Sequence, residues 1–371
     1  MTKVSLVTGA FGFSGAVLIR ELLKEGKTVV GTDIKQRLND PEQIALRKAI
    51  GLNINHPNLR LIDADITDKE SLKALFKQAG DVDIVYHTAS LYSYKAKLQD
   101  LRRINVEGIK NIISVLPADV TQFVHWSTCG VFGKPKKKGK NANIPFTEES
   151  DSPKNMPESA TRPRKTHIVN EYSISKWEQE QFLWKCYREN NLPLTIIRPA
   201  PIYGPGSNYG HGGIILSINR GVLPAIPSSA KNSITCSVNV EDIARFALYV
   251  SGKDEYIGED FNVVDSSVIS YHEFLHYIAL LTGKTIVDIP FLPMSIMRLF
   301  TLTLAKILIN LNLSRYIDKL HMVEPQSAKY IGSSYWISNK KTLDTGFVYK
   351  YDDVKDGLKD TLKWFRDHSW I

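Results

Sequence analysis

Tyr172 and Lys176 lie four residues apart in the stretch NEYSISK, within a segment whose pattern predicts a helix. At this spacing the two side chains share one helical face, so the lysine ammonium can sit near the phenol and favour its ionised form. A phenol with an ordinary pKa of about 10 is a poor base at neutral pH, and a lowered pKa would let it shuttle a proton. The spacing alone is not specific, because Tyr351 and Lys355 repeat it.

A glycine-rich turn near the N-terminus, VTGAFGFSG, places Gly9, Gly12 and Gly15 between a predicted strand and a predicted helix. The first glycine permits a tight turn, the second lets the backbone approach a pyrophosphate, and the third lets helix and strand pack closely. The unpaired N–H groups at the helix N-terminus attract phosphate. This context favours a dinucleotide-binding turn.

A second predicted strand ends in Asp33. An acid at this place accepts hydrogen bonds from the adenosine ribose hydroxyls and repels a 2′-phosphate. We therefore expect NAD as the cofactor in preference to NADP, although Lys35 and Arg37 lie close by in the sequence.

Strand-like and helix-like segments alternate through the first half of the chain. Such alternation predicts an α/β fold with a doubly wound parallel sheet, of the Rossmann type, covered by helices on both faces. The predicted strands span 3–9, 27–33, 59–65, 83–89, 122–128 and 194–200, and the predicted helices span 14–26, 69–80, 104–116 and 170–186.

Beyond residue 200 the sequence is richer in loops, and 233–250 reads as one more strand and helix. We expect an NAD-binding domain of residues 1–200, completed by about 234–252. A smaller C-terminal substrate-binding lobe would consist of 201–233 and 253–371. This lobe would close over the ends of the parallel strands, where ligands bind in such sheets.

Taken in this order, the motifs resemble those of the extended short-chain dehydrogenase/reductases, which include nucleotide-sugar epimerases and dehydratases and the 3β-hydroxysteroid dehydrogenases. The resemblance covers about residues 3–265 and rests on TGAFGFSG, DADITD, YHTAS, INVEGIKN, STCGVFG, NEYSISK and RPAPIYGPG. It implies a catalytic set of Tyr172, Lys176 and Thr128, with the threonine holding the substrate oxygen. It also implies a cofactor site formed by Gly9, Phe11, Gly12, Phe13, Gly15, Asp33, Asp65, Ile66, Thr88, Ala89, Ser90, Asn105, Tyr172, Lys176 and Pro199.

The substrate class is indicated by one departure from that family. Nucleotide-sugar members usually carry an Arg-Asp pair where this chain has Thr235 and Cys236, so a bidentate contact to a diphosphate is missing. We expect a dehydrogenase or reductase acting on a lipophilic, sterol-like or acyl-derived alcohol or ketone. The alternatives are a nucleotide-sugar epimerase or dehydratase, and a protein that senses NAD or NADH without catalysis.

An apolar segment at 289–313 stands apart from the alternating pattern. Its charged residues interrupt it too early for a membrane span of about 20 residues. It reads as a buried core helix, as a lid over a lipophilic pocket, or as a helix in peripheral contact with a membrane surface.

The formal net charge of +8 arises largely in two basic runs, 134–140 and 162–165, which read as solvated loops. Nothing resembles a nucleic-acid-binding motif. The three cysteines, Cys129, Cys186 and Cys236, have no spacing typical of a disulfide framework or a zinc site, so we expect no metal. We expect a cytoplasmic protein with a small-molecule substrate, and the resemblance suggests a homodimer.

Overall fold

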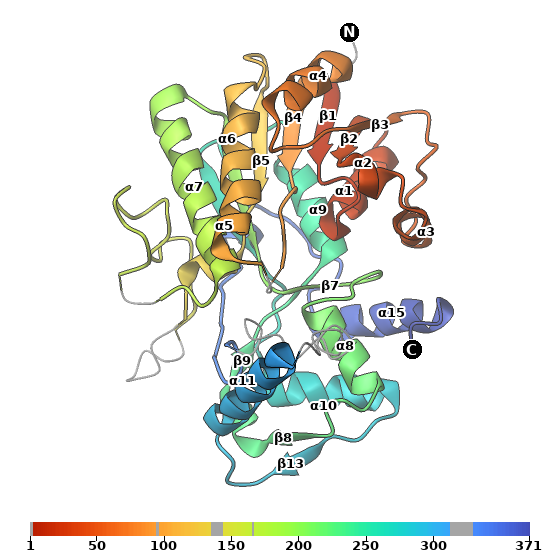
Figure 1. Ribbon diagram of the computed structural model, residues 1–371, viewed down its shortest axis with the longest axis vertical. Helices are drawn as coiled ribbons and strands as arrows, with labels where there is room; N and C mark the ends of the chain where they lie inside the picture. Colours follow the sequence, from red (N-terminus) through yellow and green to blue (C-terminus); the bar gives the residue numbers. More distant parts are fainter. Residues whose placement is uncertain (1–2, 94–95, 135–143, 165–166, 312–328) are drawn as a thin grey trace.

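The computed structural model describes residues 3–93, 96–134, 144–164, 167–311 and 329–371 (Figure 1). Its centre is a seven-stranded sheet in the order β11-β6-β5-β4-β1-β2-β3, with every pair parallel. The strands are β1 Val4–Thr8, β2 Thr28–Asp33, β3 Leu59–Asp63, β4 Val82–His87, β5 Gln122–Trp126, β6 Leu194–Pro199 and β11 Glu259–Val263. The chain runs outward from β1 in both directions, so the predicted doubly wound Rossmann sheet is confirmed.

Helices cover both faces of this sheet (Figure 1). On one face α1 packs against α9, and Leu18 and Phe246 belong to the same buried cluster. On the other face Ile112 and Trp184 share a second cluster with residues of α4. The covering helices are α1 Phe13–Lys24, α4 Lys69–Ala79, α6 Glu107–Ser114, α7 Glu171–Asn190 and α9 Val240–Val250, with the shorter α2 Lys35–Leu38, α3 Pro41–Ala49 and α5 Leu98–Leu101 beside them.

Most segments after Ala200 form a second group of elements below the sheet in Figure 1. A separate apolar cluster, with Ile215, Leu275 and Leu358 among its members, joins α8, α10 and α15. These elements are β7 Ile202–Tyr203, α8 His211–Asn219, β8 Ala225–Pro227, β9 Ile234–Thr235, β10 Val238–Asn239, β12 Ile269–Ser270, α10 Tyr271–Thr282, β13 Val287–Ile289, α11 Met294–Asn310 and α15 Val354–Asp367. The short helix α14 Lys340–Asp344 packs instead against β11 of the parallel sheet. The segment 253–371, which we assigned to the second lobe, also contributes β11 to the parallel sheet.

The apolar helix expected within 289–313 is α11, and it lies largely at the surface. Only Met294 and Ala305 are buried in it, while Leu299 and Phe300 are 65% and 67% exposed. The interpretation as a buried core helix is therefore wrong for this segment. Nowhere in the described ranges does a helix have the length and apolar character needed to cross a bilayer. Most of the basic run 134–140 lies outside the described residues.

Candidate active site

The glycine turn after β1 is packed so closely that it excludes side chains. Gly9 has a φ of +72°, and a Cβ there would lie 2.8 Å from the Cα of Ala89. A Cβ at Gly15 would overlap the carbonyl oxygen of Gly9. Gly12 is the N-cap of α1 and offers no side-chain cap, so the first-turn N–H groups of the helix face outward for an anion. The turn therefore fits the pyrophosphate of a dinucleotide.

The two aromatic residues of this turn, Phe11 and Phe13, are both buried in the core cluster on the α1 face. The backbone of Phe11 is held by charged side chains from the end of β2 and from α2. The carboxylate of Asp33 accepts a hydrogen bond from the Phe11 N–H at 3.0 Å, and Arg37 Nη2 donates to the Phe11 carbonyl at 3.0 Å. Asp33, which favours the free ribose of NAD, and Arg37, which could pair with the 2′-phosphate of NADP, therefore both contact Phe11.

The end of β4 packs directly against the glycine turn. Thr88 Oγ1 donates to the carbonyl oxygen of Thr8 at 2.7 Å, and the Ala89 N–H donates to Thr8 Oγ1 at 3.3 Å. Ser90 follows and is half-buried. These bonds fix the ends of two neighbouring parallel strands relative to each other, as a cofactor lying across both would require.

The end of β3 places Asp65 and Ile66 at the same edge of the sheet. The Asp65 carboxylate accepts from the Thr67 N–H at 2.8 Å, which shapes the turn. A Cβ at Gly108 would lie 2.8 Å from Ile66 Cδ1, so this glycine lets α6 approach the isoleucine. At the far side of the site, Pro199 ends β6 and pairs in register with Val263.

Helix α7 carries Tyr172 and Lys176 in its first two turns. Its N-cap is Asn170, whose side chain accepts from the Ser173 N–H at 2.8 Å. Asn105, fully buried, accepts from the Leu91 N–H at 2.7 Å and donates to Ser175 Oγ at 3.0 Å. The side-chain bonds of Asn105 thus tie the loop after β4 to α7, and this residue positions the helix.

Thr128 follows β5 and caps the short turn Cys129–Phe132. Its Oγ1 accepts from the Gly130 N–H at 3.1 Å. A Cβ at Gly130 would overlap Ser173 Oγ, so this turn packs directly on the start of α7. The fold therefore brings Thr128 and Tyr172 to the same end of the sheet.

The Tyr172 ring lies among aromatic side chains from separate segments. It packs edge-on against Tyr92 at 4.8 Å between centroids, Tyr92 packs on Tyr209 at 4.9 Å, and Tyr209 meets Phe13 at 5.9 Å. Tyr330, from the C-terminal part of the chain, also acts on the Tyr172 phenol electrostatically. A continuous row of aromatic rings thus runs from the glycine turn to Tyr172. Sequence reasoning missed its members other than Phe13 and Tyr172, because they come from distant segments without a local motif.

The charge states of the pair differ from the sequence-based expectation. Burial raises the pKa of the Tyr172 phenol well above its usual value, with Tyr209 adding to the rise and Ser90 opposing it. We expected Lys176 to lower this pKa, and that expectation is wrong here because the cost of burying a phenolate is larger. Burial lowers the pKa of Lys176 itself to about 7, against the opposing charge of Glu180. The phenol is therefore held protonated, whereas the lysine can lose its proton near neutral pH.

A buried ionic network lies behind Lys176, and the sequence interpretation did not identify it. Arg198 donates to Glu180 from Nε at 2.9 Å and from Nη2 at 2.7 Å, and it also pairs with Asp260. Ser127 donates a short hydrogen bond to Glu180. These groups join α7 to β6 and β11. One feature of the sequence could have indicated the network. Glu180 lies four residues after Lys176 and therefore on the same helical face.

A parallel sheet whose carboxyl edge carries a glycine turn, an acid after the second strand and a Tyr–Lys pair on one helix defines a class of proteins. It is the class of short-chain dehydrogenase/reductase-type enzymes that use a nicotinamide cofactor. Within that class, the chain belongs to the NAD dependent epimerase/dehydratase family, whose model matches residues 5–263.

Three known proteins illustrate the range of this likeness. The chain is 28% identical over 304 residues to UDP-N-acetyl-alpha-D-glucosaminuronate decarboxylase of Bacillus cytotoxicus, covering 78% of this chain and 84% of that protein. It is 29% identical over 246 residues to cinnamoyl-CoA reductase 1 of Petunia hybrida, covering 65% and 67%. The structure of dTDP-glucose 4,6-dehydratase from Bacillus anthracis in complex with NAD superposes with a TM-score of 0.68 at 18% identity, covering 100% of this chain and 98% of the other. Membership of the family indicates hydride chemistry on a small molecule with a nicotinamide cofactor.

Proposed function

We propose that this chain is an NAD-dependent reductase or dehydrogenase that transfers a hydride between nicotinamide and a hydroxyl or keto carbon of an apolar substrate, sterol-like or acyl-derived. The observation that carries the proposal is the row of aromatic rings leading to Tyr172. Walls of this kind favour apolar ligands held by a few polar groups. Thr235 and Cys236, both buried, supply no guanidinium for a sugar-nucleotide diphosphate.

The cofactor would be held along the carboxyl edge of the sheet. Backbone N–H groups of the glycine turn would bind the pyrophosphate, Asp33 the adenosine ribose, and Lys176 the nicotinamide ribose. The nicotinamide ring supplies or accepts the hydride. The remaining chemistry, which is to orient the substrate and to move one proton, belongs to side chains of this chain.

Tyr172 would act as the proton donor at the substrate oxygen. Because burial keeps its phenol protonated, it is suited to give a proton to a carbonyl oxygen that gains negative charge. Lys176, whose pKa is about 7, could return a proton to the phenol at neutral pH. The Thr128 hydroxyl would hydrogen-bond the same substrate oxygen and fix its position.

A second candidate function is that of a nucleotide-sugar epimerase or dehydratase, in which the hydride returns to the same substrate. It is favoured by the 28% identity to a UDP-sugar decarboxylase over 84% of that protein. A protein that binds NAD or NADH without catalysis is the third alternative.

A thermal-shift screen followed by a turnover assay separates these functions. A ligand that binds the native state stabilises it by RT ln(1 + [L]/Kd), which is about 2.7 kcal/mol at 100 times Kd. We expect stabilisation by NADH together with sterol-like or acyl-derived ketones, and loss of NADH absorbance when both are present. Stabilisation by UDP-sugars with NAD retained through turnover would contradict the proposal.

The preference for NAD has its own test at the glycine turn. Replacing Asp33 by Asn removes the charge that repels a 2′-phosphate, and replacing Arg37 by Ala removes the nearby cation. We expect Asp33→Asn to lower the ratio of NAD to NADP affinity and Arg37→Ala to raise it. Tighter binding of NADP than of NAD by the unchanged protein would overturn the preference.

The proposal includes peripheral membrane contact through α11 as a route to an apolar substrate. Its support is the set of exposed apolar side chains on and before this helix: Phe291, Ile296, Leu299, Phe300 and Ile307. Co-sedimentation with anionic phospholipid vesicles should fall when Leu299 and Phe300 are both changed to Asp. Cytoplasmic location and a homodimer remain predictions.

A further inference from the structure

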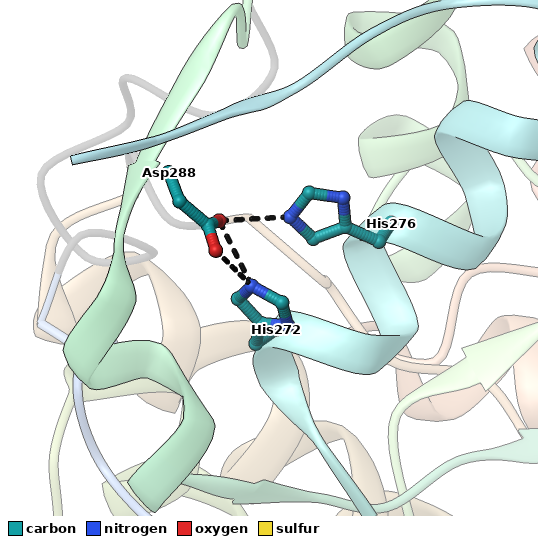
Figure 2. Close-up of side chains that lie close together, drawn as sticks. All are labelled: His272, His276 and Asp288. Carbon is teal, nitrogen blue, oxygen red and sulfur yellow. Dashed lines mark hydrogen bonds and ion pairs between the residues drawn. The ribbon is translucent and has the colours of Figure 1, made fainter. Parts of the chain in front are cut away.

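Outside the candidate active site, three side chains of metal-binding types converge on one point between α10 and β13 (Figure 2). His272 Nε2 lies 2.8 Å from each carboxylate oxygen of Asp288, and His276 Nε2 lies 2.9 Å from one of them. The two imidazole rings are 4.2 Å apart between centroids. All three potential ligand atoms lie within 4.8 Å of one another.

We propose that His272, His276 and Asp288 bind a divalent transition metal ion such as Zn²⁺. Histidines at i and i+4 present their ring nitrogens on one helical face, and Asp288 faces them from β13. Two imidazoles and a carboxylate suit Zn²⁺ and its neighbours better than Mg²⁺ or Ca²⁺, which prefer oxygen ligands. Three protein ligands leave the fourth tetrahedral position to water or another small donor.

The cluster is accessible from solvent. His272 lies in the first turn of α10, one turn before His276. The Asp288 carboxylate lies within hydrogen-bond distance of both histidine rings, so it faces the point that an ion would occupy. All three residues are partly exposed, which gives an ion a path from solvent.

The segment 272–276 reads HEFLH and so matches the H-E-x-x-H pattern, in which the two histidines bind zinc and the glutamate serves as a base in metalloproteases. Our sequence interpretation expected no metal, because the cysteines lacked the spacing of a zinc site and this histidine pair was not considered. In this structure the two histidines of the pattern are placed to bind a metal, but its glutamate is not placed to act as a base. Glu273 pairs with Lys355 at 2.6 Å and therefore already has a cationic partner. The geometry points to a metal that braces the fold, without a peptidase activity.

A bound metal ion would join α10 and β13, which are connected by only a short loop. β13 pairs with β8, and α10 packs on the turn that follows β8. A metal between α10 and β13 would tie this small sheet to the helix and stiffen the second lobe. Lys231 Nζ, 3.5 Å from the Asp288 carboxylate, adds a positive charge that opposes the bound cation.

Titration of the full chain with Zn²⁺ by calorimetry tests the site, and the visible absorption of Co²⁺ reports imidazole coordination. We expect one tight ion per chain and a rise in melting temperature on binding. His276→Ala and Asp288→Asn should each weaken binding by more than about tenfold, the loss seen even when only a supporting group is removed. His368→Ala is the matched control, because it removes an exposed histidine elsewhere and should leave binding unchanged.

A second variant tests the charge argument independently of ligand loss. Lys231→Ala removes the opposing charge and should tighten Zn²⁺ binding by about threefold at physiological salt. Far-UV circular dichroism confirms that each variant is folded. The proposal is overturned if the unchanged protein binds no Zn²⁺, or if folded His276→Ala and Asp288→Asn both bind it as tightly as the unchanged protein.

Discussion

Two pairs of tyrosine and lysine share the same four-residue spacing, and their surroundings are opposite. Tyr172 and Lys176 lie at the carboxyl edge of the sheet, where burial lowers the lysine pKa to about 7. Tyr351 donates to Asp360 at 2.9 Å, and Lys355 pairs with Glu273, which raises the Lys355 pKa. The first lysine can release a proton near neutral pH, whereas the second is held charged at the surface. Spacing places two groups together, but desolvation decides whether they can do proton chemistry.

The largest expected effect comes from removing each phenol hydroxyl. Tyr172→Phe should lower kcat by about 10²- to 10⁴-fold, since it removes the general acid. Tyr351→Phe should leave kcat unchanged. The measurement is NADH oxidation with a substrate found in the screen, with NADH binding followed separately by fluorescence. Equal, small effects of the two substitutions would contradict the proton-donor role and favour a protein that only binds the cofactor.

The next effect concerns the buried charges behind Lys176. Glu180→Gln leaves the fully buried Arg198 with one carboxylate partner, Asp260, and should lower the free energy of unfolding by about 3–5 kcal/mol. The matched control is Glu178→Gln, which breaks a partly exposed pair with Arg102 and should cost less than about 1 kcal/mol. Urea denaturation measures both values. A loss for Glu180→Gln as small as the control's would show that the network does not hold α7 in place.

A smaller effect is expected in the pH dependence of stability. The pKa of Lys176 is depressed in the folded state, so between about pH 7 and the ordinary lysine value of about 10.4 the unfolded chain binds more protons. This group therefore makes stability rise with pH in that window, by at most about 1.4 kcal/mol per pH unit. Below pH 7 the cost of the buried ammonium is fully present.

Lys176→Met should remove this contribution, so its gain in stability over the unchanged protein should be largest near pH 7 and shrink towards pH 10. Lys355→Met is the control and should keep the original slope, because the raised pKa of Lys355 lies above this window. Denaturation at several pH values gives both slopes. Identical slopes for the unchanged protein and Lys176→Met would mean that Lys176 is not desolvated.

The local features of the site could be predicted, and those that depend on distant contacts could not. The glycine turn and the Tyr172–Lys176 spacing each lie within one short segment, so the sequence displays them directly. The Arg198–Glu180–Asp260 network draws its members from two strands and a helix, and only Glu180 shares a helical face with a predicted residue. The surface position of α11 was also unpredictable from its composition, because an apolar helix is consistent with burial or exposure until its neighbours are known.

The sequence by itself determined the order of strands and helices, the dinucleotide turn and the pairing of Tyr172 with Lys176. These follow from backbone geometry and periodicity, which act over a few residues. Tertiary structure alone decided the protonation states of that pair, the row of aromatic rings beside it and the convergence of His272 and His276 on Asp288. Each of these depends on which distant groups displace water from a side chain or face it across a gap, and the folded chain sets those neighbours.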